Sequence, residues 1–377
     1  MRIGIDGLPL TEELTGIGHY TLELGSHLAL VAPMDEIQIV SPRTYLSSLT
    51  WQPERPANLR LVRSRVSPIT RHWCSIGLPR YIRRHGIEVF HGTNFEVPLR
   101  EVCPTVVTIH DLSMILYSHT QERKRVRRAQ RRLPLMARAA TMVITPTESV
   151  RREVHEHLQI PLERIVAVPE AARSCFRRLE SRQTIEARTR LGIRHEFLLF
   201  VGTVEPRKNL STLLRAFEEV LQKHGQPVQL VIAGRKGWLV DDLFASLKRS
   251  PAAEQIIFTG YLADEDLGAL YSSCAALIYP SVYEGFGLPP LEAMACGAPV
   301  IASDISAIRE VVGAAARLVS PQSTGELTHS IVELLGSVAA KKALSTAGVK
   351  RAAEFSWART AGATRNVYTE ARERFAR

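Results

Sequence analysis

Short runs of β-branched and other apolar residues alternate along this chain with longer segments of helical periodicity, in two successive series. Such alternation is typical of parallel α/β sheets, in which a helix joins each strand to the next. The first series predicts strands at 2–5, 37–40, 59–62, 89–91, 106–109, 142–145 and 165–169. The second predicts strands at 198–201, 230–233, 256–259, 276–279, 300–302 and 317–319. Two series with strands of their own predict two doubly wound α/β domains.

The boundary between the two domains is predicted in a polar, basic stretch at 171–190, which lacks strand character. A chain of 377 residues also exceeds what one hydrophobic core usually holds. We therefore predict an N-terminal domain over 1–172 and a C-terminal domain over 173–356, with a final helix over 357–377.

Composition narrows the class of protein. The chain is 45% hydrophobic and 23% charged, which is ordinary for a soluble globular protein. It has no apolar run of about 18 residues, as a membrane span needs, and it begins with a strand pattern instead of a signal peptide. The five cysteines are scattered without a C-x-x-C pair, which argues against a disulfide framework or a zinc site and favours the cytoplasm. A net charge of +10 predicts an anionic partner, which could be nucleic acid, lipid or substrate.

The most informative motif lies at 280–294, where a buried strand pattern leads into a short helix. Glu284 stands before a glycine turn and Glu292 stands eight residues later on the helix. Glycines let an anionic group approach backbone N–H groups, with the positive end of the helix dipole behind them. This arrangement suits a nucleotide sugar, and the residues predicted here to bind the donor are Gly285, Phe286, Gly287, Leu288 and Glu292.

The Glu284-x7-Glu292 element resembles that of the retaining glycosyltransferases of family 4, the sucrose-synthase and mannosyltransferase type. The alternative is an ordinary strand-turn-helix with surface acids. The resemblance implies the GT-B fold, in which two Rossmann-like domains face a donor cleft and the last helix, here 357–377, crosses back to the N-terminal domain. It also implies that Glu284 orients sugar hydroxyls and that Glu292 holds the ribose.

A second motif follows the first predicted strand of the C-terminal half. Gly202 permits close backbone approach, and Arg207 and Lys208 place two cations beside a helix N-terminus. Cations at fixed positions stabilise the charge of a leaving diphosphate. The alternative is a solvated basic turn. The family often has an arginine directly after this glycine, whereas this chain has Thr203. Either Arg207 also takes the role of that arginine, or the Thr203 hydroxyl faces the sugar or the phosphate.

Two further strand ends are weaker signals. The resemblance places the nucleotide base against the backbone of Tyr261 and Leu262. The acids Asp264, Glu265 and Asp266 are predicted to begin a helix, where their negative charge interacts favourably with the helix dipole. We predict no metal site here. We expect no cofactor beyond the nucleotide-sugar substrate.

In the first half, the resemblance places the glycine-rich segment of Gly16 and Gly18 over the donor phosphates. His110 ends a predicted strand, and the family has a histidine facing the donor sugar at this position. A lone histidine is more often a structural hydrogen-bonding residue. Asn94 and Asp111 follow strand ends and are predicted to lie on the acceptor side.

The segment 122–132 carries seven cations and one acid. One interpretation is a solvated helix, and the other is contact with an anionic membrane surface. We predict surface contact without insertion, because the segment lacks a continuous apolar face.

Together these features predict a metal-independent, retaining glycosyltransferase with His110, Glu284, Arg207 and Lys208 as catalytic residues. The predicted donor is GDP-mannose or a GDP-deoxyhexose, and the acceptor is a lipid-linked glycan or polysaccharide of the cell surface. The predicted location is the cytoplasm, with peripheral contact on the inner membrane face. The alternatives are a UDP-sugar-dependent glucosyl- or N-acetylglucosaminyltransferase, a sugar-nucleotide epimerase, and a basic nucleic-acid-binding protein.

Overall fold

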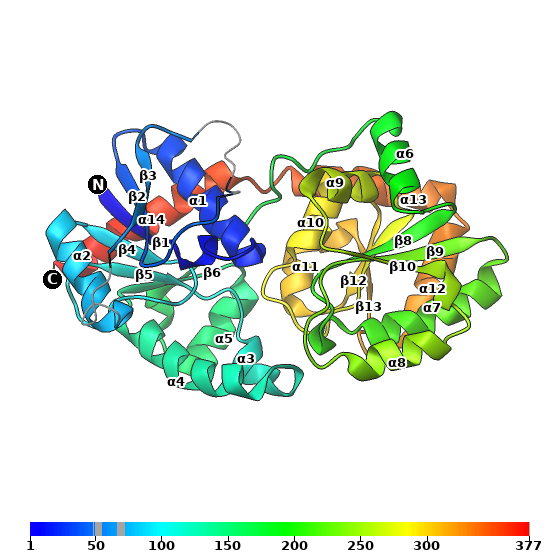
Figure 1. Cartoon of the computed structure of the whole chain (residues 1–377), viewed down its shortest axis with the longest axis horizontal. Coiled ribbons are helices and arrows are strands. Elements are labelled where there is room, and N and C mark those ends of the chain that lie inside the picture. The colour runs from blue at the N-terminus through cyan, green and yellow to red at the C-terminus, as the bar shows by residue number, and fades with distance from the viewer. Residues whose placement is uncertain (48, 50–54, 66–71, 377) are drawn as a thin grey trace. The chain divides into compact units, whose positions relative to one another are not determined.

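The computed structural model describes residues 1–47, 49, 55–65 and 72–376 of the chain (Figure 1). Its contacts divide the chain into two units. Unit 1 comprises Met1–Leu112, Arg127–Glu170 and Ser356–Arg377, and unit 2 comprises Ser113–Val126 and Ala171–Phe355. Each unit contains one parallel β-sheet with helices packed against it, which confirms the predicted class of two Rossmann-like α/β domains.

The sheet of unit 1 has seven strands in the order β3-β2-β1-β4-β5-β6-β7. All its pairings are parallel, and β1 lies inside the sheet with β2 on one side and β4 on the other. The order reverses at β1, which is the arrangement that a doubly wound sheet requires. The strands are β1 (Arg2–Asp6), β2 (Glu36–Ser41), β3 (Leu59–Arg63), β4 (Val89–Gly92), β5 (Thr105–Thr108), β6 (Met142–Thr145) and β7 (Ile165–Ala167).

The longer helices of unit 1 include two that lie far apart in the sequence and pack together (Figure 1). On α1 (Gly16–Val31), the ring of Tyr20 meets that of Trp357 on α14 (Trp357–Phe375), with centroids 5.9 Å apart. The Tyr368 hydroxyl of α14 lies 2.7 Å from His91 Nδ1 on β4. The other helices of eight or more residues are α2 (Leu78–His85), α5 (Glu148–Leu158) and α4 (Arg123–Ala139), whose first four residues are grouped with unit 2. In the part of the chain that the structure describes, no helix has the length and apolarity to cross a membrane.

The sheet of unit 2 has six parallel strands in the order β10-β9-β8-β11-β12-β13. The strands are β8 (Glu196–Val201), β9 (Val228–Ala233), β10 (Ile256–Gly260), β11 (Ala276–Tyr279), β12 (Val300–Ser303) and β13 (Arg317–Val319). The short helix α3 (Ser113–Leu116) belongs to unit 2. The longer helices are α6 (Ser181–Arg190), α7 (Leu210–His224), α8 (Asp241–Arg249), α9 (Asp264–Ser273), α10 (Leu288–Ala295), α11 (Ser306–Val312), α12 (Thr324–Leu335) and α13 (Val338–Ala352).

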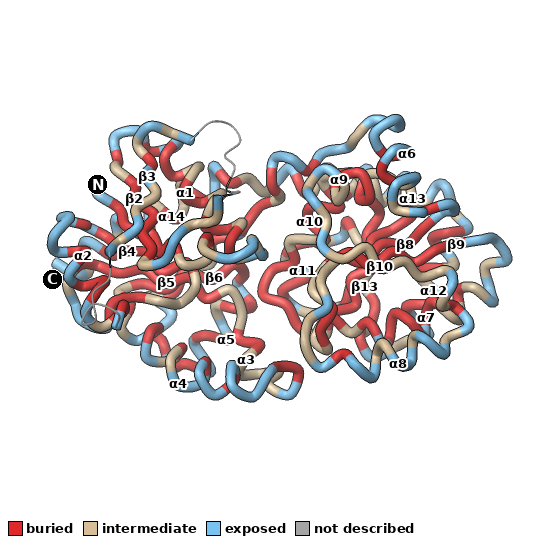
Figure 2. Tube along the Cα trace, in the orientation of Figure 1, coloured by how far each residue is buried: buried red, intermediate tan, exposed pale blue. Residues whose placement is uncertain are grey.

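The core of unit 2 lies on both faces of its sheet, as Figure 2 shows for the buried strands. Along β8, Leu199 belongs to one hydrophobic cluster, whereas Leu198 and Phe200 belong to the cluster on the other face. Because successive side chains of a strand point to opposite faces, a strand buried on both faces reads as a continuous apolar run. This is the reason why the sequence pattern locates the strands well.

The segment 113–126 belongs to a different unit from the one that the sequence analysis expected. The sequence analysis placed 113–126 within the N-terminal domain, but its contacts group it with unit 2. The indole Nε1–H of Trp238 donates to the Thr120 carbonyl over 2.9 Å, and the Arg125 guanidinium lies 5.0 Å from the centre of the Trp238 ring. Tyr117 stacks on Tyr283 with ring centroids 4.8 Å apart. Pairings between side chains so distant in sequence leave no periodic signal in the chain.

Candidate functional site in unit 2

The loops that follow β8 and β9 interlock at the carboxyl edge of the sheet. The N–H of Gly202 donates to the Ala233 carbonyl, and the N–H of Val204 donates to the Arg235 carbonyl, both over 2.9 Å. Gly202 and Gly234 have φ angles of 145° and 152°, which favour glycine. A Cβ added at Gly234 would overlap the carbonyl oxygen of Gly202. The lack of a side chain at Gly234 therefore lets the two loops approach closely at Gly202, which the sequence analysis predicts to bind the donor.

Gly234→Ala should lower the free energy of unfolding by about 2 kcal/mol or more, because it adds a backbone clash to a strained φ. Gly225 is a matched control: its φ is 71°, but a Cβ there meets nothing within 4 Å. Gly225→Ala should cost only about 1 kcal/mol, the conformational part of the effect. Urea unfolding measures both variants, and equal losses would show that the close approach of the two loops is unimportant.

The turn that carries Arg207 and Lys208 is held by the loop after β11. The N–H of Val282 donates to the Arg207 carbonyl over 2.9 Å. Asn209, with φ 57°, donates from its side-chain amide to the carbonyls of Pro280 (3.1 Å) and Pro321 (2.8 Å). Asparagine tolerates this left-handed conformation better than most residues. Asn209 thus joins three strand-end loops, a role that the sequence analysis missed.

The structure brings three predicted catalytic residues together in one buried cluster. The Glu284 carboxylate accepts from Arg207 Nη1 over 2.9 Å and from Lys208 Nζ over 2.6 Å. Arg207 Nη2 also donates to Glu205 over 2.6 Å, and Lys208 Nζ lies 2.9 Å from the Tyr279 hydroxyl. Two cations and two carboxylates balance, which is how ionised groups are tolerated in an interior.

Burial and the neighbouring charges shift the pKa values of Glu284 and Lys208 in opposite directions. Burial disfavours the ionised form of Glu284, but the charges of Arg207 and Lys208 outweigh it and lower the pKa of this carboxyl to about 2. Burial lowers the pKa of Lys208, and the Glu284 carboxylate opposes that shift. Glu284 is therefore ionised over the whole physiological range.

The glycine turn leads into α10 as the sequence predicts. Gly287 precedes the helix with φ 111°, and a Cβ there would lie 2.6 Å from Ile308 Cδ1. The buried ring of Phe286 packs edge-on against Phe355, with centroids 6.0 Å apart. Pro289 and Pro290 have no N–H, so backbone donors at this helix start are confined to Leu288 and the turn before it.

Glu292 lies on α10 and is buried. Its carboxylate accepts from Arg173 Nε over 3.2 Å and from the Tyr271 hydroxyl over 3.4 Å. Burial raises the pKa of Glu292 to about 7, although the Arg173 charge opposes the shift. Arg173 also pairs with Asp264 over 2.7 Å. The sequence analysis missed Arg173, since one arginine in a basic connecting stretch carries no distinguishing signal.

The predicted base-binding residues follow β10. Gly260 has φ 72°, Tyr261 is 49% exposed, and Leu262 is half-buried. The Arg235 guanidinium lies 5.7 Å from the centre of the Tyr261 ring. Thr203 is half-buried in the loop after β8. The roles of Tyr261, Leu262 and Thr203 toward a donor stay predictions.

The residues predicted in unit 1 fall at three places. Gly16 and Gly18 lie in the first turn of α1. A Cβ at Gly18 would lie 2.9 Å from Leu14 Cδ2, so this glycine allows close packing, whereas a Cβ at Gly16 meets nothing within 4 Å. Asn94 and Asp111 are half-buried. Their predicted roles toward donor and acceptor are untested by this geometry.

His110 makes two hydrogen bonds to acceptors. Its Nδ1 lies 2.9 Å from the Glu170 carboxylate, and its Nε2 lies 2.9 Å from the Thr93 carbonyl. Two acceptors favour the protonated ring, in which both nitrogens donate. Burial opposes this charge, but Glu170 and the Thr93 carbonyl raise the pKa of His110 above its usual 6.5. The sequence analysis missed Glu170, which directly follows the strand predicted at 165–169.

Glu170→Gln should lower the free energy of unfolding by about 1–3 kcal/mol at pH 6, the worth of a hydrogen bond to a charged group. A raised pKa in the folded state adds stability below pH 6.5, and this increment is lost as pH rises through the raised pKa. The difference between wild type and variant should therefore shrink from pH 6 to pH 9. The exposed Glu156→Gln variant is the control, and a pH-independent difference would contradict the imidazolium.

Two family models, which match successive parts of the sequence, together cover most of the chain. Residues 14–171 match the family described as Glycosyltransferase Family 4, and residues 181–351 match Glycosyl transferases group 1. The chain is a GT-B glycosyltransferase. The resemblance stated from the Glu284-x7-Glu292 element is thereby confirmed.

Individual relatives agree with this assignment. The glycosyltransferase is 29% identical over 380 residues to the O-antigen chain mannosyltransferase B of Escherichia coli, covering 98% of this chain and 99% of that protein. It is 32% identical over 228 residues to the serotype-specific mannosyltransferase WbdA of Escherichia coli, covering 59% of this chain but 28% of that longer protein. A sucrose-phosphate synthase of Thermosynechococcus elongatus superposes with a TM-score of 0.77 at 21% identity, covering 98% of each chain. This last likeness shows the fold alone.

Proposed function

We propose that the glycosyltransferase is a retaining mannosyltransferase that uses GDP-mannose or a related GDP-deoxyhexose. Its acceptor is a lipid-linked glycan or a polysaccharide, for which an α-mannoside end serves as a probe. The full-length similarity to an O-antigen chain mannosyltransferase supports the sugar and the acceptor class. The observation that carries the proposal is the buried cluster of Arg207, Lys208 and Glu284 at the carboxyl edge of the unit 2 sheet.

The cluster suits a donor whose charge grows on its diphosphate. Because Glu284 holds both Arg207 and Lys208, the two cations are fixed before the substrate arrives and need little reorganisation. The diphosphate lies against the Gly202 backbone and the N–H groups of the glycine turn. Glu284 accepts a hydrogen bond from the sugar, and Glu292 binds the ribose hydroxyls.

The reaction proceeds on one face of the sugar. The bond from the anomeric carbon to the diphosphate oxygen breaks with its electron pair on the oxygen, where Arg207 and Lys208 stabilise the charge. The acceptor hydroxyl forms the new bond on the same face and gives its proton to the departing phosphate oxygen. Glu284 is not placed as the nucleophile of a paired-carboxylate mechanism, because both its oxygens accept from cations. No divalent metal is needed in this scheme.

We also propose that α4 contacts an anionic membrane surface. Arg123, Lys124, Arg127 and Arg131 are exposed and have no acidic partner among the described residues. At about 1 kcal/mol per cation near an anionic surface, these four provide peripheral attraction. Exchanging all four for glutamine should abolish sedimentation with phosphatidylglycerol vesicles at low salt, while nucleotide binding is unchanged. Undiminished sedimentation would contradict contact through α4.

A thermal-shift panel tests the donor. GDP, UDP and ADP and their sugar conjugates are compared with Mg²⁺ and with EDTA. A ligand at about 100 times its dissociation constant stabilises the fold by about 2.7 kcal/mol. We expect stabilisation by GDP and GDP-mannose that EDTA does not remove. Stabilisation by UDP species alone would overturn the GDP-mannose assignment, and a shift that requires Mg²⁺ would overturn metal independence.

A further inference from the structure

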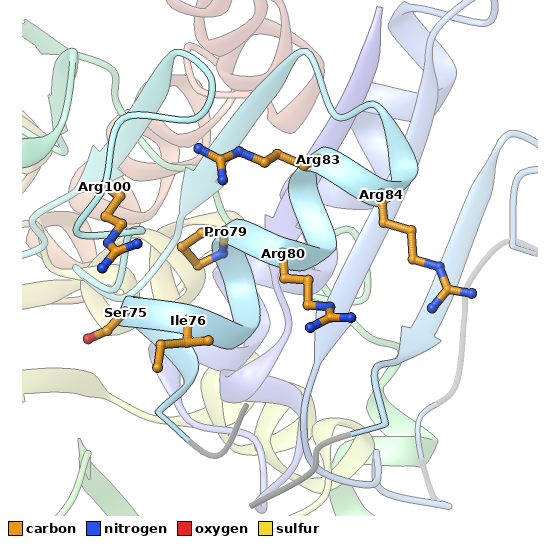
Figure 3. Close-up of a pocket in the computed structure, with 7 residues that line it drawn as sticks. All are labelled: Ser75, Ile76, Pro79, Arg80, Arg83, Arg84 and Arg100. Carbon is orange, nitrogen blue, oxygen red and sulfur yellow. The ribbon is translucent and has the colours of Figure 1, made fainter. Parts of the chain in front are cut away.

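A pocket of about 670 Å³ opens on unit 1 along α2 and the π-helical turn before it, Trp73–Gly77 (Figure 3). Its wall is formed by Ile76 and Pro79, and four arginines surround it: Arg80, Arg83, Arg84 and Arg100. All the lining residues belong to unit 1, whereas the Arg207–Lys208–Glu284 cluster belongs to unit 2. The pocket and the candidate donor site therefore share no residue.

The charge of the pocket is unbalanced. None of the described residues that line it is acidic, and no described carboxylate pairs with any of its four arginines. Other arginines of unit 1 do have such partners, for example Arg2 with Glu36 and Arg365 with Asp35. Like charges three or four residues apart on a helix repel each other and cost stability. A bound anion would remove this repulsion.

The four arginines line the pocket from two sides (Figure 3). Arg80 and Arg84 are four residues apart and share a face of α2. In Figure 3 the side chain of Arg83 reaches to the side on which Arg100 lies, with Pro79 between this pair and Arg80. The loop of Arg100 is tied to the turn before α2, because the N–H of Leu99 donates to the Cys74 carbonyl over 3.0 Å.

We propose that this pocket binds a phosphoryl or diphosphoryl group. Arginine presents a planar fork of N–H donors that matches phosphate oxygens in pairs, which a lysine does not. Four guanidinium groups exceed the charge of one phosphate monoester and suit a diphosphate. The group can be carried by a lipid, whose chain would lie against Ile76, or it can belong to a free phosphorylated compound.

Arginine labelling of the whole protein tests the site directly. Phenylglyoxal modifies exposed arginines, and peptide mass spectrometry gives the rate at each one. Inorganic diphosphate should slow the labelling of Arg80, Arg84 and Arg100, by about tenfold at ten times its dissociation constant. Arg249, exposed on α8, should react at an unchanged rate. Equal rates at Arg80, Arg84 and Arg100 with and without diphosphate would overturn the proposal, whatever the nucleotide panel shows.

A pair of variants and a second probe complete the test. Arg80→Gln with Arg84→Gln should abolish the diphosphate protection of Arg100, whereas Lys248→Gln with Arg249→Gln, which removes the same charge elsewhere, should preserve it. Protection of Arg100 that survives in the first variant would contradict the site. Farnesyl diphosphate then separates the sources: protection at a concentration at least about tenfold below that of inorganic diphosphate assigns a lipid-borne group. If farnesyl diphosphate and inorganic diphosphate protect at equal concentrations, the site is assigned to a free phosphorylated compound.

Discussion

Lys208→Met should lower the free energy of unfolding by about 3–5 kcal/mol, the cost of removing one partner of a buried ion pair. Lys208 is 8% exposed, and its ammonium lies 2.6 Å from the Glu284 carboxylate. Methionine keeps the volume of the side chain and removes the charge, which leaves Glu205 and Glu284 with Arg207 alone. Urea unfolding at pH 7 measures the loss.

Two further variants serve as comparisons for the stability loss of Lys208→Met. Lys223 pairs with Glu219 at 3.0 Å on the exposed face of α7, and Lys223→Met should cost no more than about 0.5 kcal/mol. The double variant Lys208→Met with Glu284→Gln removes both charges and should recover part of the loss. A Lys208→Met variant within about 1 kcal/mol of wild type would show that the cluster is not electrostatically coupled.

Glu284→Gln should reduce turnover at least about 100-fold, the effect of losing one preorganised polar group at a reacting centre. Glutamine has the same shape, but its amide has one acceptor oxygen, and its NH2 faces a cation that the carboxylate had paired. Both the proposed contact to the sugar and the positions of Arg207 and Lys208 are disturbed. Turnover is measured as nucleotide release with the donor that the thermal-shift panel selects, at a temperature where the variant is folded.

Glu219→Gln is the control for charge loss, and its turnover should match wild type. The thermal shift of Glu284→Gln with the free nucleotide should persist, because the proposed contact of Glu284 is to the sugar. Near wild-type turnover in Glu284→Gln would remove this residue from the mechanism. A lost nucleotide shift would assign it to nucleotide binding instead.

The strands were predictable from sequence because parallel strands buried on both faces are continuous apolar runs. The predicted strands at 142–145, 276–279 and 317–319 coincide with β6, β11 and β13. The sequence analysis assigned Arg207, Lys208 and Glu284 to one site. They meet because the strands before them, β8 and β11, are neighbours whose carboxyl ends lie at one edge of the sheet.

Other parts of the candidate site depend on tertiary pairing. The sequence analysis gave Glu205 no role, yet its carboxylate holds Arg207. The partners of Glu292 and His110, Arg173 and Glu170, lie 119 and 60 residues away from them. Such pairs are set by how the loops meet and have no periodic signature. Glu170 could have been found by the rule that singled out His110, because it follows a strand end.

The most direct test of the central claim is the configuration of the product. The protein is incubated with GDP-mannose labelled with ¹³C at the anomeric carbon and with p-nitrophenyl α-mannoside as acceptor. The one-bond carbon–proton coupling at the new linkage distinguishes α from β. The proposed same-face mechanism predicts an α-linked disaccharide from this α-linked donor, formed equally in EDTA. A β-linked product would contradict retention, and a product from UDP-glucose but not from GDP-mannose would contradict mannosyl transfer.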